Sequence, residues 1–230
     1  MIHSKKVEEF KITIMRNEIL KLFINKNTKF IGLYIPQNFS YPIHLIFGAE
    51  YCLSTIEYLS CDANTNQSIL KGLSKICKSI KKLRFDIIQD FKMVELIKAQ
   101  KNLNDIYMSC YSYLRDELYC NNLEESLIKN SDTIQYLRID WTPITQTLSL
   151  LTHMINPDPW KGRHPMLLQI IPYCNFTIML PQKLHHQLQI GCLIKDYEAN
   201  GTIEKYDVDW YGQDFEDFKW VQGESITYFN

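Results

Sequence analysis

The stretch QSILKGLSKICKSIKKLRFDIIQDFKMVELIKAQ, residues 67–100, decides the predicted fold. Its apolar residues recur three or four positions apart along one stripe, formed by Ile69, Leu73, Ile76, Ile80, Leu83, Ile87, Phe91 and Val94. This spacing is typical of an amphipathic helix. The polar residues at 62–66 precede it and supply candidate N-caps. We therefore predict one long helix over about residues 67–100.

Other helices are predicted on both sides of this stretch, at about residues 5–25, 49–61, 104–120 and 144–155. In the first of them the apolar residues at helical spacing are Ile12, Met15, Ile19, Leu22 and Phe23. Residues 30–35 form a short apolar run that ends at Pro36. Because proline has no N–H for a ladder, we expect a strand that stops there.

The C-terminal third is predicted to be β-rich, and six of the eight prolines lie at or after Pro143. Residues 166–171, 176–180 and 225–229 are short apolar runs that predict strands. Residues 188–197 and 202–210 flank Asn200-Gly201, a dipeptide that favours a type I′ hairpin turn. In that hairpin Leu193, Tyr197, Tyr206, Val208 and Trp210 would face inward, and Asp207 and Asp209 would face water.

These elements predict an α+β fold, in which several helices pack on a small, mostly antiparallel C-terminal sheet. We expect a single domain over residues 1–230, helix-rich at 1–155 and β-rich at 165–230, because 230 residues suit one ordinary domain. We expect no internal repeat and no low-complexity segment.

Composition indicates a globular protein of a reducing compartment. Hydrophobic residues make up 46% and charged residues 22%, with 13% aromatic. Few alanines against many Ile, Lys and Asn suggest an AT-rich genome. No signal peptide and no run of about 18 apolar residues is present, so we expect a cytoplasmic protein that does not span a membrane. The seven cysteines contain no Cys-x-x-Cys pair, and we expect free thiols.

Charge is balanced overall at −1 but is uneven along the chain. Residues 1–104 carry 16 basic and 9 acidic side chains, whereas residues 105–230 carry 9 basic and 17 acidic ones. The balance makes nucleic acid an unlikely partner. Lys71, Lys75, Lys78 and Lys82 would form a stripe on the long helix, either a solvated face or a contact for phosphate groups.

The loop at residues 156–165 holds the candidate site. Three prolines restrict its backbone and leave Trp160, Arg163 and His164 between them. Arg163 could bind a carboxylate or phosphate, Trp160 could stack on a flat ligand, and His164 could transfer a proton. The alternative is a stiff connection with a core tryptophan and solvated cations.

Other clusters support no metal or cofactor. His185 and His186 lie near Cys174 and Cys192, but neighbouring residues in a strand point to opposite faces. Asp207 and Asp209 share a strand face that also suits ordinary solvent exposure. Nucleotide-binding glycine motifs are missing. Two hypotheses remain: an interaction protein, such as a regulatory one, with a protein partner, or a small-molecule enzyme that binds a small anionic substrate through residues 160–165.

Overall fold

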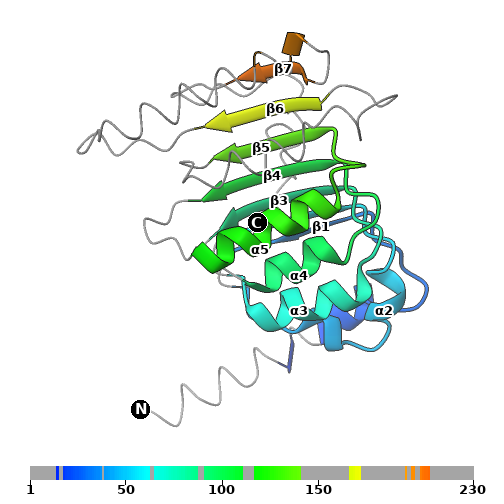
Figure 1. The fold of residues 1–230 in the computed structure, drawn as a ribbon. Helices are drawn as coiled ribbons and strands as arrows, with labels where there is room; N and C mark the ends of the chain where they lie inside the picture. Colours follow the sequence, from blue (N-terminus) through cyan, green and yellow to red (C-terminus); the bar gives the residue numbers. More distant parts are fainter. Residues whose placement is uncertain are drawn as a thin grey trace.

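A computed structural model of the chain shows one parallel sheet with helices stacked beside it (Figure 1). The structure describes residues 14–15, 18–37, 39–62, 65–87, 91–110, 117–140, 166–171, 195, 198–199 and 203–207. Its strands are β1 (Gly32–Ile35), β2 (Tyr58–Cys61), β3 (Lys82–Ile87), β4 (Asp105–Cys110), β5 (Tyr136–Asp140), β6 (Met166–Ile171) and β7 (Ile203–Asp207). The described helices are η1 (Ile43–Leu45, a 3₁₀ turn), α2 (Ala49–Cys52), α3 (Gln67–Ile76), α4 (Phe91–Lys98) and α5 (Glu117–Lys129).

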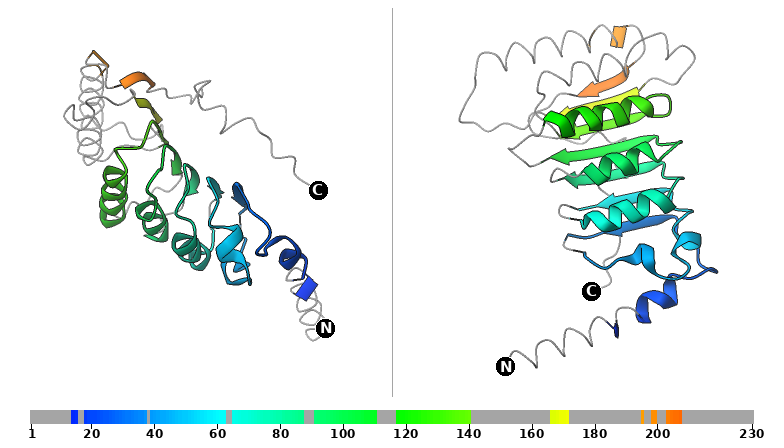
Figure 2. Two further views of the ribbon diagram at one scale, coloured as in Figure 1. Left: turned by 90° about the vertical axis from the view of Figure 1, so that its right-hand side faces the viewer. Right: turned by 60° about the horizontal axis from the view of Figure 1, so that its bottom comes forward.

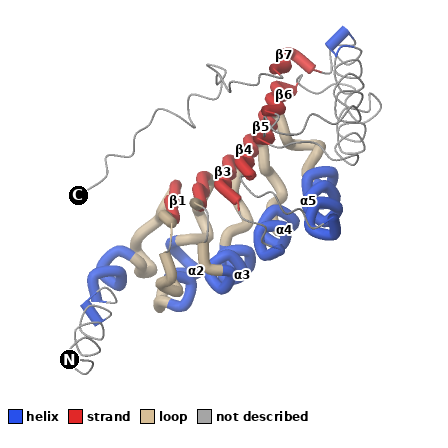
Figure 3. The backbone as a smooth tube through the Cα atoms, turned by 90° about the vertical axis from the view of Figure 1, so that its left-hand side faces the viewer, coloured by secondary structure: helices blue, strands red, loops and turns tan. Residues whose placement is uncertain are grey.

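The strands follow one another in the sheet in the order of the sequence, β1 to β7, and every neighbouring pair is parallel. A parallel neighbour requires the chain to return to the same end of the sheet before each new strand. Between β2 and β5 this return is made by α3, α4 and α5, which stack on one face of the sheet (Figures 2 and 3). The described chain is therefore an α/β solenoid, in which each turn is a strand and a helical return.

The turns share a sequence pattern of two apolar residues three positions apart, followed by a third two positions later. It recurs as Phe30/Leu33/Ile35, Ile56/Leu59/Cys61, Ile80/Leu83/Phe85, Leu103/Ile106/Met108 and Ile134/Leu137/Ile139. In the three middle turns all nine of these side chains are at most 1% exposed. The sequence therefore repeats, although helix lengths and loops differ between turns.

Backbone hydrogen bonds repeat in step with this pattern just before each strand. The carbonyl of Ile31 accepts from the N–H groups of Glu57 and Tyr58, at 2.8 and 3.0 Å. The carbonyl of Glu57 accepts in the same way from the next turn, at Lys81 and Lys82. In the same way, the carbonyl of Lys81 accepts from the N–H groups of residues 104 and 105, and the carbonyl of Asn104 accepts from those of residues 135 and 136. Each turn is thereby held in register with the one before it.

Buried polar side chains add a second connection between turns. The thiol of Cys77 donates to the carbonyl of Leu53 at 3.2 Å. Gln100 is 3% exposed. Its Nε2 donates to the Cys77 carbonyl at 3.0 Å, and its Oε1 accepts from the N–H of Ile80 at 3.1 Å. These bonds satisfy backbone groups that would otherwise be buried without a partner.

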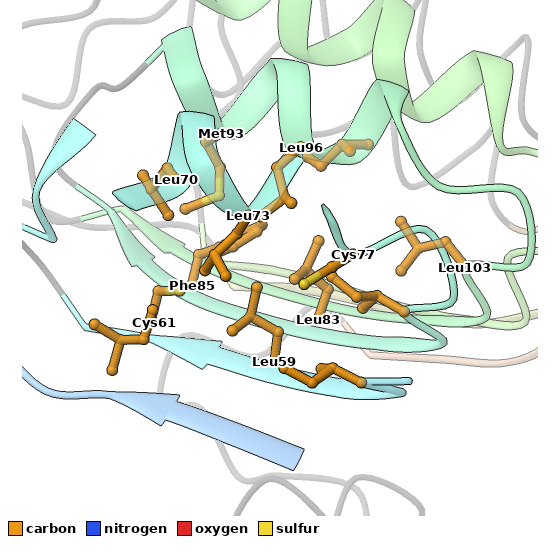
Figure 4. Packing of buried hydrophobic residues seen from close by; sticks show 14 of the residues in the cluster. Leu59, Cys61, Leu70, Leu73, Cys77, Leu83, Phe85, Met93, Leu96 and Leu103 are labelled. Atoms are coloured by element: carbon orange, nitrogen blue, oxygen red, sulfur yellow. The ribbon is translucent and has the colours of Figure 1, made fainter. Parts of the chain in front are cut away.

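The core lies between the sheet and the helices. Leu59, Cys61, Leu83 and Phe85 project from the strands toward the helix layer, and Leu70, Leu73, Met93 and Leu96 meet them (Figure 4). Helices pack about 8–10 Å apart, whereas strands are about 4.8 Å apart, so the helix layer must form the outer side of any curve. The opposite face of the sheet is the inner side.

The predicted long helix at 67–100 is wrong. The structure divides it into α3, β3 and α4. The chain leaves the helix at Cys77, whose backbone is extended, and the strand residues Leu83 and Phe85 alternate with more exposed ones. The helices predicted at 49–61 and 104–120 are wrong in part. Each range includes a helical stretch, α2 at its start or the beginning of α5 at its end, but β2 and β4 are strands where helix was predicted. By contrast, the strands predicted at 30–35 and 166–171 are confirmed as β1 and β6.

The predicted α+β class, with helices on a mostly antiparallel sheet, is contradicted by the all-parallel order. The predicted hairpin fails for the same reason. β7 pairs in parallel with β6, and Lys195, Glu198 and Ala199 are helical where an antiparallel strand was expected. The expected strands at 176–180 and 225–229 and the helix at 144–155 lie outside the described residues.

Candidate interaction surface

Exposed apolar side chains gather at the β1 end of the solenoid. Among the described residues, ten large hydrophobic residues are exposed, and nine of them lie between residues 14 and 51. The nine, which we call the β1-end surface, are Ile14, Met15, Ile19, Leu22, Phe23, Ile31, Leu45, Phe47 and Tyr51. Their exposed fractions run from 44% to 77%. The tenth, Leu118, lies on α5 and is separate from them.

The helical segment at residues 18–23 supplies one part of this surface. Its inner side carries Leu20, which packs against the core. Ile24, just after the segment, is 5% exposed and belongs to the core. Its outer side carries Ile19, Leu22 and Phe23, which are 51–73% exposed. A helix in a solenoid normally buries one stripe against the core and covers the other side with polar residues. Here the outer side carries three large apolar residues beside the exposed Glu18–Lys21 ion pair.

A close approach of backbone to backbone joins this segment to the start of α2. Gly48 has φ +94°, and a Cβ built there would lie 2.8 Å from the Cα of Asn25. Such a contact permits glycine alone. The ammonium of Lys26 then lies 5.0 Å from the ring centre of Phe47 and 5.3 Å from that of Tyr51. The end of the helical segment therefore lies against the start of α2, and Lys26 makes cation–π contacts with rings on both sides of Gly48.

Strand β1 adds an open edge to the same end of the molecule. Within the described residues, β1 pairs with β2 alone. The carbonyls of Ile31 and Ile35 accept from β2 and the residue that follows it. Because the groups of a parallel strand alternate in direction, the N–H and C=O of Gly32 and Tyr34 point away from β2.

The face of the sheet opposite the helices carries a row of polar and aromatic side chains that are buried or half-buried. In register, Tyr34, Ser60, Arg84, Tyr107 and Arg138 follow one another from β1 to β5. The guanidinium groups of Arg84 and Arg138 lie 5.0 and 4.7 Å from the Tyr107 ring centre. Tyr107 is 7% and Arg138 is 5% exposed. Ser60 and Arg84 separate the two tyrosines of this row, so it is not a continuous aromatic stacking surface.

An ion pair stabilises the same face at the start of the strands. The ammonium of Lys82 lies 3.1 Å from Oδ2 of Asp105, whose side chain is 6% exposed. Burial raises the pKa of the Asp105 carboxyl, and Lys82 partly offsets this. The predicted stripe of lysines is thereby divided. Lys71 and Lys75 are exposed on α3 and Lys78 is exposed just after it. Lys82 belongs to β3 instead.

The candidate residues Trp160, Arg163 and His164 lie outside the described residues, as do His185, His186, Cys174 and Cys192. Among the cysteines, the structure describes the side chains of Cys52, Cys61 and Cys77, and these three are free and buried, as predicted. Burial raises the pKa of Cys77 to about 12, so this thiol is not a nucleophile at neutral pH. No group of three metal-binding side chains occurs in the described part of the chain.

Sequence reasoning missed the β1-end surface, although its signal was present. The apolar stripe that predicted the helix at 5–25 contains Met15, Ile19, Leu22 and Phe23. These residues are exposed rather than buried. Periodicity locates an apolar stripe but does not say what covers it. A second apolar stripe, at Leu20 and Ile24, is also visible in the sequence and could have indicated that the first stripe is the exposed one.

Comparison with known proteins identifies no relative: no protein-family model, curated protein or solved structure matches the chain. Within the ranges described, no helix has the length and apolar character needed to cross a membrane.

Proposed function

We propose that this chain is a protein-binding solenoid that engages its partner through the β1-end surface. The observation that carries the proposal is the gathering of nine exposed large apolar side chains at one end of the described fold. Single exposed apolar residues are ordinary on a protein surface, whereas a contiguous group of them is typical of an interaction site.

The architecture supports the same function. A strand and a helical return in each turn, with apolar residues spaced as in Ile80-x-x-Leu83-x-Phe85, resemble the leucine-rich-repeat pattern. Solenoids present long surfaces and commonly act by binding other macromolecules. Their end turns need a polar outer face to remain soluble alone. The β1 end instead exposes nine large apolar side chains among its charged ones.

A site-specific photo-crosslinker can test this proposal. Placed at residue 47 in place of Phe47, it should form a protein adduct of defined mass after irradiation, in the purified chain or in a cell extract. Placed at residue 118 in place of Leu118, which is 61% exposed on α5, it should form much less. The adduct at residue 47 should disappear when Leu22→Lys adds a charge to the same surface. Equal adducts at both positions, or none at either, would overturn the proposal.

A further inference from the structure

We infer that His44 is a pH-sensitive switch, which holds the segment at residues 43–47 against α3 while the imidazole is neutral and releases it when the imidazole is protonated. This segment carries Leu45 and Phe47, two members of the β1-end surface. The inference rests on the proposed function and names a way in which its site is regulated. Three features of the described residues support it: the packing of the ring, the surroundings of its Nδ1 atom and the charges nearby.

The ring of His44 packs directly on the backbone of α3. His44 is half-buried in η1, and η1 lies against α3. A Cβ built on the buried Gly72 would overlap this ring and would lie 2.7 Å from its Nδ1. Position 72 therefore admits the imidazole because glycine has no side chain.

Side chains rather than backbone bonds hold the segment on the helix. Its backbone hydrogen bonds are local, as when the N–H of Ile46 donates to the carbonyl of Ile43 at 3.2 Å. Among the described residues, no backbone hydrogen bond joins the segment to α3. The position of residues 43–47 therefore depends on the packing of His44 together with the buried Ile43 and Ile46.

The neutral form of His44 suits this site better than the charged form. In the described part of the chain, its Nδ1 is buried and has no hydrogen-bond partner. A neutral imidazole can leave Nδ1 without a proton, whereas the imidazolium has an N–H on both nitrogens. A buried donor without an acceptor destabilises the packed state. Burial lowers the pKa of His44 below its usual value of 6.5, and the nearby Lys75 lowers it further.

The charges on the neighbouring elements do not compensate the protonated ring. Helix α3 presents Lys71 and Lys75, both basic and exposed. Helix α2 carries Glu50 beside Tyr51 and Cys52, and among the described residues Glu50 makes no ion pair with the imidazole. Because the pKa is lowered in the packed state, the contact is strongest above about pH 6.5. It should weaken as the pH falls from there toward the lowered pKa.

Nuclear magnetic resonance of the full chain tests the switch without a partner. The His44 ring signal should titrate with a midpoint below 6.5, and the methyl signals of Ile43 and Ile46 should shift with the same midpoint. His44→Gln identifies the ring signal and should abolish these methyl shifts. Lys75→Gln should raise the midpoint, whereas Lys71→Gln, one turn earlier on the same helix, should change it little. A midpoint at or above 6.5, or methyl signals that do not follow the ring, overturns the inference.

The photo-crosslinker at residue 47 measures the effect on the surface. The yield of protein adduct should fall about tenfold between about pH 7.5 and about pH 5.5, because the buried donor releases the segment. His44→Gln should remove this fall. Gly72→Ala should also remove it, because the added Cβ displaces the ring.

Each remaining outcome separates the switch from the proposed function. An adduct whose yield does not depend on pH overturns the inference and leaves the proposed function standing. A pH dependence that survives both His44→Gln and Gly72→Ala also overturns the inference. If no adduct forms at any pH while the methyl signals follow His44, the proposed function fails and the switch stands.

Discussion

The middle of the solenoid and its β1 end use the same apolar residue types in opposite ways. Around β2, β3 and β4, each turn has a neighbour on both sides, and the apolar side chains facing the helices are at most 1% exposed. At the β1 end the neighbour is present on one side of the described chain, and Phe47 is 77% exposed. In a solenoid each turn contacts mainly its neighbours, so burial depends on position in the stack more than on residue type.

The largest effect expected from this comparison is on core aromatics. Phe85→Ala in β3 should lower the free energy of unfolding by about 3–5 kcal/mol, because a fully buried ring leaves a cavity. Phe47→Ala removes the same ring from an exposed site. It should change the stability of the monomer by less than about 0.5 kcal/mol.

Urea unfolding of both variants measures the difference. A similar loss for both would show that Phe47 is packed in solution, and the contrast between the two regions would then be wrong.

The second effect concerns the polar connection between middle turns. Gln100→Leu keeps the side-chain volume but leaves the Ile80 N–H and the Cys77 carbonyl buried without their partner. The expected loss is about 2–4 kcal/mol of stability. Asn102→Leu, an exposed site in the same loop, is the control and should change little. Hydrogen exchange should also become faster at Ile80 in the first variant, and unchanged protection there would contradict the assignment.

The stretch at 67–100 explains why sequence reasoning found the apolar positions but not the fold. The pattern Ile80-x-x-Leu83-x-Phe85 begins with a three-residue step, which is also a helical step. The final two-residue step marks the strand. The same ambiguity produced the wrong helices at 49–61 and 104–120. Aligning the pattern at Ile56, Ile80 and Leu103 would have revealed the repeat, which irregular spacing conceals.

Strand direction could not be predicted from local chemistry. Asn200-Gly201 is typical of a hairpin, yet the strand that follows pairs in parallel with β6. Parallel pairing depends on the connection that returns the chain to the same end of the sheet and on the neighbouring repeat of the solenoid, and both are non-local features. The β1-end surface escaped prediction for a related reason. The stripe of Ile19, Leu22 and Phe23 is visible in the sequence, but what covers it depends on neighbours.

The third prediction concerns the pH dependence of stability that a buried carboxyl group in the helix layer produces. Glu124 on α5 is 8% exposed, and burial raises its pKa to about 7 from 4.5. The folded state therefore binds a proton that the unfolded chain releases. The contribution of Glu124 to stability should be largest below about pH 4.5, should fall by about 2 kcal/mol between pH 5 and pH 7, and should be lost above pH 7.

Glu124→Gln should remove this slope and stabilise the protein at pH 8. Glu125→Gln, with an exposed side chain 3.5 Å from Lys98, is the neighbouring control and should keep it. Thermal unfolding of the three proteins at pH 5 and pH 8 gives the comparison. A wild type whose stability rises over this range would contradict the burial of Glu124.

The smallest effect compares how helices begin in the two regions. In the middle, Asn66 caps α3: its backbone is extended and its Oδ1 accepts from the N–H of Ser68 at 2.8 Å. At the β1 end, α2 begins at Gly48 without a side-chain cap. Asn66→Ala should therefore cost about 1 kcal/mol, since it leaves a helix N–H without this acceptor. Gln67→Ala, exposed at the next position, should be neutral or slightly stabilising because alanine favours helix. The denaturant midpoints of the two variants separate capping from helix propensity, provided that the free energy of unfolding depends on denaturant concentration with the same slope in both. If both variants lose the same stability, the cap contributes nothing, and the start of α3 is fixed instead by the burial of Ile69 and Leu70.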